Sequence, residues 1–299
     1  MGMWLYAKRI VVSNAVRCSD RGPMIIAANH PNSFFDAVVI ALTMQRPISF
    51  IARGDVFAKP AIAKLLRSIH LIPIFRIRDG REKLSLNEAT FLESERLLKQ
   101  GAALLVFVEG FCVYQTSLQL PLKKGAPRML VSAWQHQVPA RVLPVWLHYN
   151  CFQKIGKTIH IRFGEPFGQE IISGSRSAAV AYNLINNRTA SDLLALQQAA
   201  KFHHNLPTGL AYLLMTIPAI AGALTHAPLY LPVTRLAAKL NKGGVFYDGI
   251  VFGMLLVFYP LYLLLVFVLL QTLLKNYVSA LALTLLMPLL ARVYVLWKK

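Results

Sequence analysis

Acidic residues are scarce in this 299-residue chain: 13 Asp and Glu stand against 32 Lys and Arg, which gives a formal net charge of +19. Charged residues make up only 15% of the sequence and apolar residues 56%, whereas soluble domains carry about 25% charged residues. This composition excludes a disordered chain and argues against an ordinary soluble protein. The positive charge requires an anionic partner, and the hydropathy favours an acidic lipid surface over nucleic acid, for which no recognised motif is present.

Cysteine is also rare. Cys18, Cys112 and Cys151 are too few and too widely spaced for a disulfide framework or a CxxC metal site, which fits a reducing compartment. The N-terminal segment lacks a long apolar run followed by a small-residue cleavage site, so it does not predict a signal peptide. We expect residues 1–17 to form an amphipathic helix at the membrane interface, although an ordinary core helix fits the pattern equally well.

The C-terminal region, residues 207–299, is poor in charged residues. It contains seven basic residues and one acidic residue, Asp248. Residues 249–274 contain no charged residue, and residues 276–297 contain only Arg292. Both segments are long enough to span a bilayer, so they predict a transmembrane hairpin in which Arg292 extends toward the interface.

A third apolar segment, residues 207–232, precedes this hairpin. It is uncharged but is interrupted by Pro218 and Pro228. A full crossing would also place the basic loop that follows it on the opposite side from a cytoplasmic catalytic domain, against the positive-inside tendency. We therefore expect a re-entrant or half-inserted segment here.

Residues 18–170 alternate β-rich runs with helical stretches, which predicts an α/β layered structure within a domain that we expect to cover residues 18–206. The expected strands cover residues 23–28, 48–52, 71–75, 103–108, 141–147 and 158–163. The expected helices cover residues 34–44, 56–68, 83–100 and 126–136.

His30 follows the first expected strand, at the edge of the sheet where α/β folds bind their ligands. A histidine there can accept the proton of an attacking hydroxyl group. A nearby carboxylate such as Asp36 can orient the ring and stabilise its protonated form. The spacing alone is weak evidence, because such a pair occurs by chance in many chains.

Four blocks in order resemble the phospholipid and glycerol acyltransferase family, which includes glycerol-3-phosphate and lysophosphatidic acid acyltransferases. Asn29, His30 and Asp36 are similar to the catalytic His/Asp block of that family. The other blocks are residues 50–53, residues 109–110 and residues 143–145. The blocks extend over about half of the chain. The resemblance implies a glycerol-3-phosphate acyltransferase-like mixed sheet flanked by helices, followed by the C-terminal transmembrane region.

The resemblance also implies roles for individual residues. His30 and Asp36 would be catalytic, and Arg53 would bind the phosphate of the acceptor. Asn29, Glu109 and Gly110 would belong to the substrate site. Four further basic residues are suited to bind a phosphate, although a solvated basic surface is the alternative for each of them. They are Lys59, Lys123, Lys124 and Arg128.

The third block departs from the family pattern, which commonly reads Pro-Glu-Gly-Thr-Arg or Pro-Glu-Gly-Thr-Ser. Here Phe111 and Cys112 follow Gly110. Loss of the usual polar pair indicates that Lys123, Lys124 or Arg128 supplies the charge, or that the acceptor is not a glycerophosphate. Cys112 as an acyl-carrying nucleophile is less favoured than a buried free cysteine, because no activating base is evident nearby in the sequence.

The implied function is a membrane-bound O-acyltransferase that needs no metal and no cofactor besides its acyl donor, acyl-CoA or acyl-ACP. The implied acceptor is a lysophospholipid, with 1-acyl-sn-glycerol-3-phosphate as the first candidate, and anionic lipids would bind the basic surface. Alternatives are transfer to glycerol-3-phosphate or a lyso-aminolipid, or a catalytically silent lipid-binding protein. The expected location is the bacterial inner membrane, with the catalytic domain on the cytoplasmic side.

Overall fold

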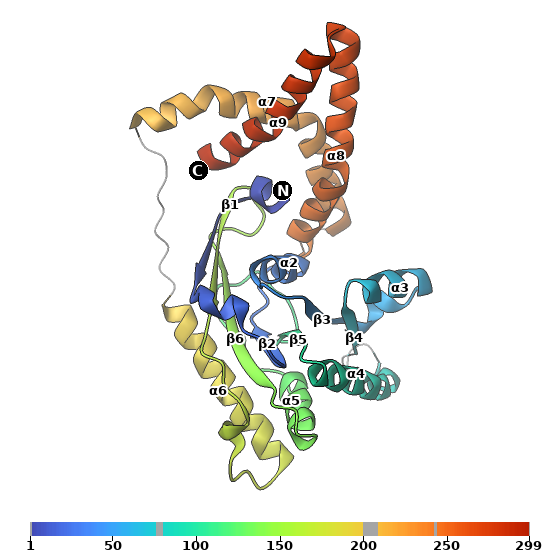
Figure 1. Cartoon of the computed structure of the whole chain (residues 1–299), viewed down its shortest axis with the longest axis vertical. Helices are drawn as coiled ribbons and strands as arrows, with labels where there is room; N and C mark the ends of the chain where they lie inside the picture. The colour runs from blue at the N-terminus through green and yellow to red at the C-terminus, as the bar shows by residue number, and fades with distance from the viewer. Residues whose placement is uncertain (1, 76–79, 200–208, 242–243, 299) are drawn as a thin grey trace.

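A seven-stranded mixed sheet runs through the first half of the chain in the computed structural model, which describes residues 2–75, 80–199, 209–241 and 244–298 (Figure 1). The strands are β1 (Ala7–Ser13), β2 (Met24–Ala28), β3 (Ile48–Arg53), β4 (Leu71–Ile74), β5 (Ala103–Phe107), β6 (Arg141–Tyr149) and β7 (Lys157–Phe163). Their order in the sheet is β1-β7-β6-β2-β5-β3-β4. All neighbouring strands are parallel except β6 and β7, which pair antiparallel. The mixed α/β class expected from the sequence is therefore confirmed.

Helices cover both faces of this sheet. Those of the α/β body are α2 (Phe34–Thr43), α3 (Pro60–Ser68), α4 (Asn87–Lys99), α5 (Gly125–Gln135) and α6 (Ala178–Gln198). Alternate residues of β2 face two different hydrophobic clusters: Ile26 packs with residues of α2 on one side, and Ile25 packs with residues of α4, α5 and α6 on the other. Strand β2 thus lies in the centre of the core, buried on both faces as a parallel strand requires.

The prediction of a helix over residues 1–17 is wrong beyond the first turn of that helix. Helix α1 spans only Gly2–Tyr6, and the chain then continues as β1, which pairs in parallel with β7. The β-branched residues of β1 suit a strand, and pairing with β7 satisfies the backbone groups along one side of it. The charged Lys8 and Arg9 that suggested an interfacial helix lie instead on an edge strand, where charged side chains are common.

Two of the expected helices begin later than the sequence indicated. A 3-10 turn (Gly54–Phe57) separates β3 from α3, which begins at Pro60 because proline is tolerated in the first turn of a helix but not in its interior. Another 3-10 turn (Arg81–Leu86) precedes α4. Helix α6 was not among the expected elements.

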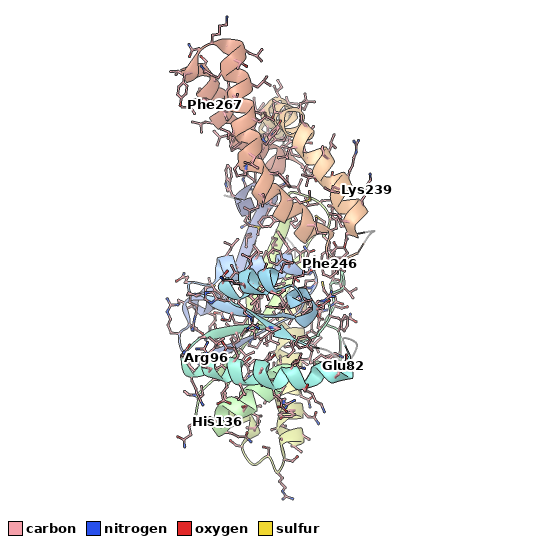
Figure 2. All side chains as sticks on the ribbon, turned by 90° about the vertical axis from the view of Figure 1, so that its right-hand side faces the viewer. Glu82, Arg96, His136, Lys239, Phe246 and Phe267 are labelled. Atoms are coloured by element: carbon pink, nitrogen blue, oxygen red, sulfur yellow. The ribbon has the colours of Figure 1, made fainter. Side chains whose placement is uncertain are left out.

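Three apolar helices complete the chain: α7 (Gly209–Asn241), α8 (Tyr247–Leu274) and α9 (Tyr277–Trp297). Each is long and apolar enough to cross a membrane. Figure 2 shows α8 projecting from the sheet, with Phe246 near its base and Phe267 close to the far end of the molecule. The expected hairpin is present as α8 and α9, and the boundary expected at residue 206 lies outside the described residues.

The described part of residues 207–232 contains no reversal of the chain, and the expected half-insertion into the membrane stays a prediction. Helix α7 continues through Pro218, Pro228 and Pro232 without reversing direction. Close packing against α9 supports it: a side chain at Gly222 would collide with the backbone carbonyl oxygen of Leu290. Small residues at such contacts let apolar helices approach closely, and neighbouring helices compensate for the backbone hydrogen bonds that proline removes.

Arg292, expected to extend toward the interface, contacts the N-terminal segment of the chain. Its guanidinium group donates hydrogen bonds to the backbone carbonyls of Trp4 and Ala7, at 2.6 and 2.7 Å, and of Lys8 at 3.1 Å. It also lies 5.1 Å from the ring centroid of Trp4. Arg292 therefore attaches α9 to the N-terminal segment of the α/β body.

Candidate active site

The candidate site lies where three neighbouring parallel strands end. His30 follows β2, Glu109 follows β5, and Arg53 is the last residue of β3. Adjacent parallel strands bring their carboxyl ends to one edge of the sheet. The topology therefore collects residues from three of the four sequence blocks at this edge.

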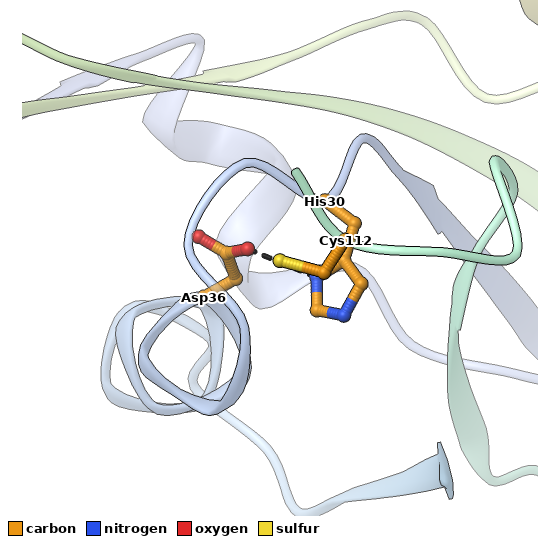
Figure 3. A group of neighbouring side chains, drawn as sticks. All are labelled: His30, Asp36 and Cys112. Atoms are coloured by element: carbon orange, nitrogen blue, oxygen red, sulfur yellow. Dashed lines mark hydrogen bonds and ion pairs between the residues drawn. The ribbon is translucent and has the colours of Figure 1, made fainter. Parts of the chain in front are cut away.

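His30 and Asp36 form a hydrogen-bonded pair. The distance between His30 Nδ1 and Asp36 Oδ2 is 2.9 Å. The second ring nitrogen of His30, Nε2, points away from the carboxylate (Figure 3). The imidazole stacks on the ring of Phe107 with a centroid separation of 3.7 Å and an interplanar angle of 11°. The carboxylate and the aromatic ring thus fix the orientation of the imidazole and leave Nε2 for chemistry.

Asp36 lies in the first turn of α2 and is fully buried. Its Oδ2 also accepts a hydrogen bond from the backbone N–H of Asn32 at 2.7 Å, and its Oδ1 accepts one from the Tyr149 hydroxyl at 2.7 Å. Burial raises the pKa of Asp36, and the hydrogen bonds from His30, Tyr149 and Asn32 oppose that rise. These donors stabilise the ionised carboxylate in its buried position.

Glu109 binds the backbone of the loop between β2 and α2, residues 29–33, which is called the His30 loop here. Its Oε2 accepts a hydrogen bond from the backbone N–H of His30 at 2.7 Å. Its Oε1 accepts one from Gln115 Nε2 at 2.7 Å and one from the backbone N–H of Gln119 at 2.8 Å. The side chain is buried, and burial raises the pKa of Glu109. Glu109 thus positions the backbone of His30 and ties it to the loop after β5.

Cys112 lies beside the His30–Asp36 pair (Figure 3). Its Sγ accepts a hydrogen bond from the backbone N–H of Ser33 at 3.0 Å. Burial, together with the nearby Asp36 carboxylate, raises the pKa of the Cys112 thiol well above its usual range. A reactive thiolate is therefore disfavoured.

The side chains of His30, Asp36 and Cys112 bring potential metal ligands within 4.8 Å of one another. Asp36 Oδ2 already accepts hydrogen bonds from two groups, and Cys112 Sγ accepts one from Ser33. We therefore interpret the group as a hydrogen-bonded acid–base pair with a neighbouring neutral thiol.

Asn29 has a structural position rather than one open to a ligand. It is buried, and its amide exchanges two hydrogen bonds with the backbone of Leu147: Nδ2 donates to the carbonyl oxygen at 2.9 Å, and Oδ1 accepts from the N–H at 2.7 Å. Asn29 thus joins the end of β2 to β6. The substrate-binding role expected for it has no support in this geometry.

The basic residues expected to bind phosphate divide into two groups. Arg53 is exposed at the end of β3 and pairs with Asp55, and Lys59 is an exposed residue just before α3. Strand β3 lies two positions from β2 in the sheet, about 10 Å away. Arg53 therefore lies at the same edge of the sheet as His30.

The second group follows the third block. Gly110 adopts a φ of +72°, which favours glycine, and a side chain there would collide with Lys123. Lys123 therefore lies close to Gly110 in the loop that follows β5. Lys124 is the exposed residue that precedes α5. The Arg128 guanidinium lies 4.3 Å from the ring centroid of Phe91 on α4, so it is already engaged by the body of the protein.

Sequence reasoning missed several residues that hold the pair in place: Asn32, Phe107, Gln115, Gln119 and Tyr149. Asn32 lies within the first block and Phe107 two residues before the third, so their position in the sequence was an available signal. Tyr149 lies at the end of β6, four residues after the fourth block, and only the pairing of β6 with β2 brings that part of the chain to the site.

Comparisons with known proteins give a family model and a similar solved structure. A family model described as Acyltransferase matches residues 9–148. A search of curated proteins finds no match. Among solved structures, the chain is similar to the crystal structure of the 1-acyl-sn-glycerophosphate (LPA) acyltransferase PlsC from Thermotoga maritima. The two are 20% identical in sequence with a TM-score of 0.46, over 68% of this chain and 77% of that chain.

Proposed function

We infer that the chain acts as an acyltransferase, as the family model matching residues 9–148 indicates, and that it transfers a fatty acyl group from a thioester donor to the hydroxyl group of a lysophospholipid. The observation that carries this inference is the His30–Asp36 pair at the carboxyl end of β2. The first candidate acceptor is 1-acyl-sn-glycerol-3-phosphate, which would yield phosphatidic acid.

The geometry supports a direct transfer. His30 Nε2 accepts the proton of the acceptor hydroxyl as its oxygen attacks the thioester carbonyl, and Asp36 stabilises the resulting imidazolium. The tetrahedral intermediate then breaks its C–S bond. The departing thiolate takes the proton from His30, which leaves an ester and a free thiol. Neither a metal nor a covalent enzyme intermediate is required.

The oxyanion of the intermediate needs hydrogen-bond donors. Helix α2 begins at Phe34, directly after the His30 loop. The first N–H groups of a helix have no acceptor within the helix and carry the positive end of its dipole. They are well suited to stabilise a negative charge beside His30.

Arg53 is the first candidate for the phosphate of the acceptor, because it ends a strand at the same edge of the sheet as His30. Lys59 and Lys123 are further candidates from the two sides of that edge. The reacting carbonyl is the same in acyl-CoA and acyl-ACP, so both donors suit this mechanism.

We place the catalytic domain at the cytoplasmic face of a bacterial inner membrane. Helix α8 supports membrane insertion, because it exposes a continuous set of large apolar side chains. They include Leu256, Val257, Leu261, Leu264, Leu265, Val268, Leu269 and Leu273. Basic residues near the bilayer would attract anionic lipids and keep the site where a water-soluble donor meets a lipid acceptor.

The test is acyl transfer by the purified full-length protein in detergent. The donors are acyl-CoA and acyl-ACP, and the acceptors are lysophosphatidic acid, glycerol-3-phosphate and a lyso-aminolipid. Mass spectrometry identifies the product. We expect phosphatidic acid from lysophosphatidic acid. Transfer to the aminolipid alone would contradict the proposed acceptor. Absence of all transfer would contradict the enzymatic function.

A further inference from the structure

A second group of buried polar side chains adjoins the His30 loop, residues 29–33, which is called the catalytic loop below. Asp248 of α8 and Lys157 of β7 form an ion pair in which neither residue is exposed. The Tyr6 hydroxyl donates a hydrogen bond to Asp248 Oδ1, and Asn32 Nδ2 donates one to Asp248 Oδ2 at 2.6 Å. A single carboxylate therefore joins the N-terminal helix, the sheet, the catalytic loop and an apolar C-terminal helix.

Asn32 connects this group to the reactive pair. Its side chain donates to Asp248, and its backbone N–H donates to Asp36 Oδ2 at 2.7 Å. The same Asp36 oxygen lies 2.9 Å from His30 Nδ1. Three hydrogen bonds in series thus lead from Asp248 of α8 to the imidazole of His30.

Packing reinforces the link between α8 and the loop. A side chain at Gly249 would lie 3.4 Å from Phe34, the first residue of α2. One turn further along α8, the ring of Phe252 lies 5.2 Å from that of Tyr6 and 5.3 Å from that of Phe35. The start of α8 is therefore seated against the start of α2, where the catalytic loop ends.

A buried ion pair is a costly way to attach one helix to a sheet. Two charges must leave water, and apolar residues of similar volume often hold an interface equally well. What the charged pair adds is direction: Lys157 and Tyr6 hold the Asp248 carboxylate so that it faces Asn32. Asp248 is also the single acidic residue in the sequence from 207 to 299.

We propose that Asp248 is a positioning residue for the His30–Asp36 pair and acts through Asn32. The orientation of the reactive imidazole then depends on correct docking of the apolar C-terminal helices. The expected effect on turnover rests on the acyl transfer proposed above. The expected effect on hydrogen exchange in the loop is independent of acyl transfer.

Two variants separate this role from simple attachment of α8. Lys157→Met with Asp248→Leu removes both charges together, so no unpaired charge remains buried, and it leaves the amide of Asn32 without its acceptor. Asn32→Ala keeps the ion pair and removes only the connection, which retains a test if the double variant does not fold. The control is Arg188→Gln with Asp192→Asn, which removes an exposed ion pair on α6.

The first readout is hydrogen–deuterium exchange of the loop amides, including those of Asn32 and Ser33. We expect faster exchange in the loop of both test variants, with the β2 amides unchanged. The second readout is acyl transfer. We expect kcat to fall by about fivefold or more, the scale on which members of one hydrogen-bond network couple, with the KM for the acceptor unchanged.

The two test variants should also be non-additive. If Asn32 acts through Asp248, adding Asn32→Ala to the charge-free pair lowers kcat no further. Unchanged loop exchange in Asn32→Ala, unchanged kcat in either test variant, or additive losses would each overturn the proposal. If the wild type transfers no acyl group to any acceptor, the proposed function fails, and the exchange data alone still decide the role of Asp248.

Discussion

The imidazole of His30 is held from three directions at once. Asp36 binds Nδ1, Phe107 stacks against the ring, and Glu109 binds the backbone N–H. A general base gains rate only when its geometry is fixed before the reaction begins. The residues around His30 therefore fix the imidazole in the orientation that the proposed chemistry requires.

Tyr149 should control the pH range of activity. Its hydroxyl donates to Asp36 and lowers the pKa of that carboxyl. In Tyr149→Phe the ionised form loses this donor, so the pKa of Asp36 rises further. Less Asp36 is then ionised at acidic pH, and the acid limb of the kcat/KM profile moves to higher pH.

The control for this measurement is Tyr182→Phe on α6, which we expect to leave the profile unchanged. An acid limb in Tyr149→Phe that coincides with that of the wild type would show that Asp36 ionisation does not limit activity.

Cys112 should be replaceable. In Cys112→Ser the hydroxyl oxygen can still accept the hydrogen bond from the Ser33 N–H, so we expect most of the activity to remain. The raised pKa of the Cys112 thiol agrees with a role other than nucleophile. The checks are the transfer rate and a search by mass spectrometry for an acylated protein. Loss of activity in the variant together with an acyl adduct on the wild type would contradict direct transfer.

At the scale of elements, the site depends on the loop between β5 and α5. Glu109 accepts hydrogen bonds from three N–H groups in this loop and the His30 loop. In Glu109→Gln, an NH2 group must face at least one of those donors, and a buried donor without a partner costs about 1–3 kcal/mol. We expect a lower melting temperature and a lower kcat.

The matched control is Glu165→Gln, because Glu165 is an exposed residue that pairs with Arg17. A melting temperature and kcat of Glu109→Gln equal to those of this control would refute the positioning role of Glu109.

The sequence was sufficient to predict the central strands and helices of the fold. Strand β2 is a continuous apolar run that ends at a polar motif, so both its burial and its functional end were predictable. Strand β1 was not, because Lys8 and Arg9 break its apolar pattern and its pairing with β7 depends on residues about 150 positions away. Local patterns cannot report such distant partners.

The site was predictable to a similar extent. The family motif indicated His30 and Asp36, and the structure places them in hydrogen-bond contact. The supporting residues were not predictable, because Tyr149 and Asp248 reach the loop only through the order of the strands and the docking of α8. Asn29 is the opposite case: it belongs to the motif, but its amide is used by the backbone of Leu147.

At the scale of the whole molecule, the two ends of the chain are joined. Arg292 of α9 donates to three carbonyls of the N-terminal segment, and Lys8 Nζ donates to the carbonyl of Lys298 at 3.0 Å. The apolar helices are thus attached to the α/β body at several points. This arrangement would hold the catalytic edge at a fixed orientation to the bilayer that the helices are suited to enter.

Arg292→Met tests this attachment. The variant keeps an apolar stem but removes the guanidinium donors, so we expect a melting temperature in detergent lower by several degrees, about 2–4 °C for each kcal/mol lost in a protein of this size. Lys275→Met, in the turn between α8 and α9, is the control and should melt like the wild type. Equal melting of Arg292→Met and the wild type would mean that these hydrogen bonds add no stability.

The most direct test of the central claim is the rate of acyl transfer to lysophosphatidic acid by His30→Ala. Loss of a general base lowers a rate by about 10²–10⁴-fold, and we expect a loss in this range with the protein still folded. His136→Ala, at the end of α5, should retain the wild-type rate. Wild-type transfer by His30→Ala would contradict the assignment of the active site.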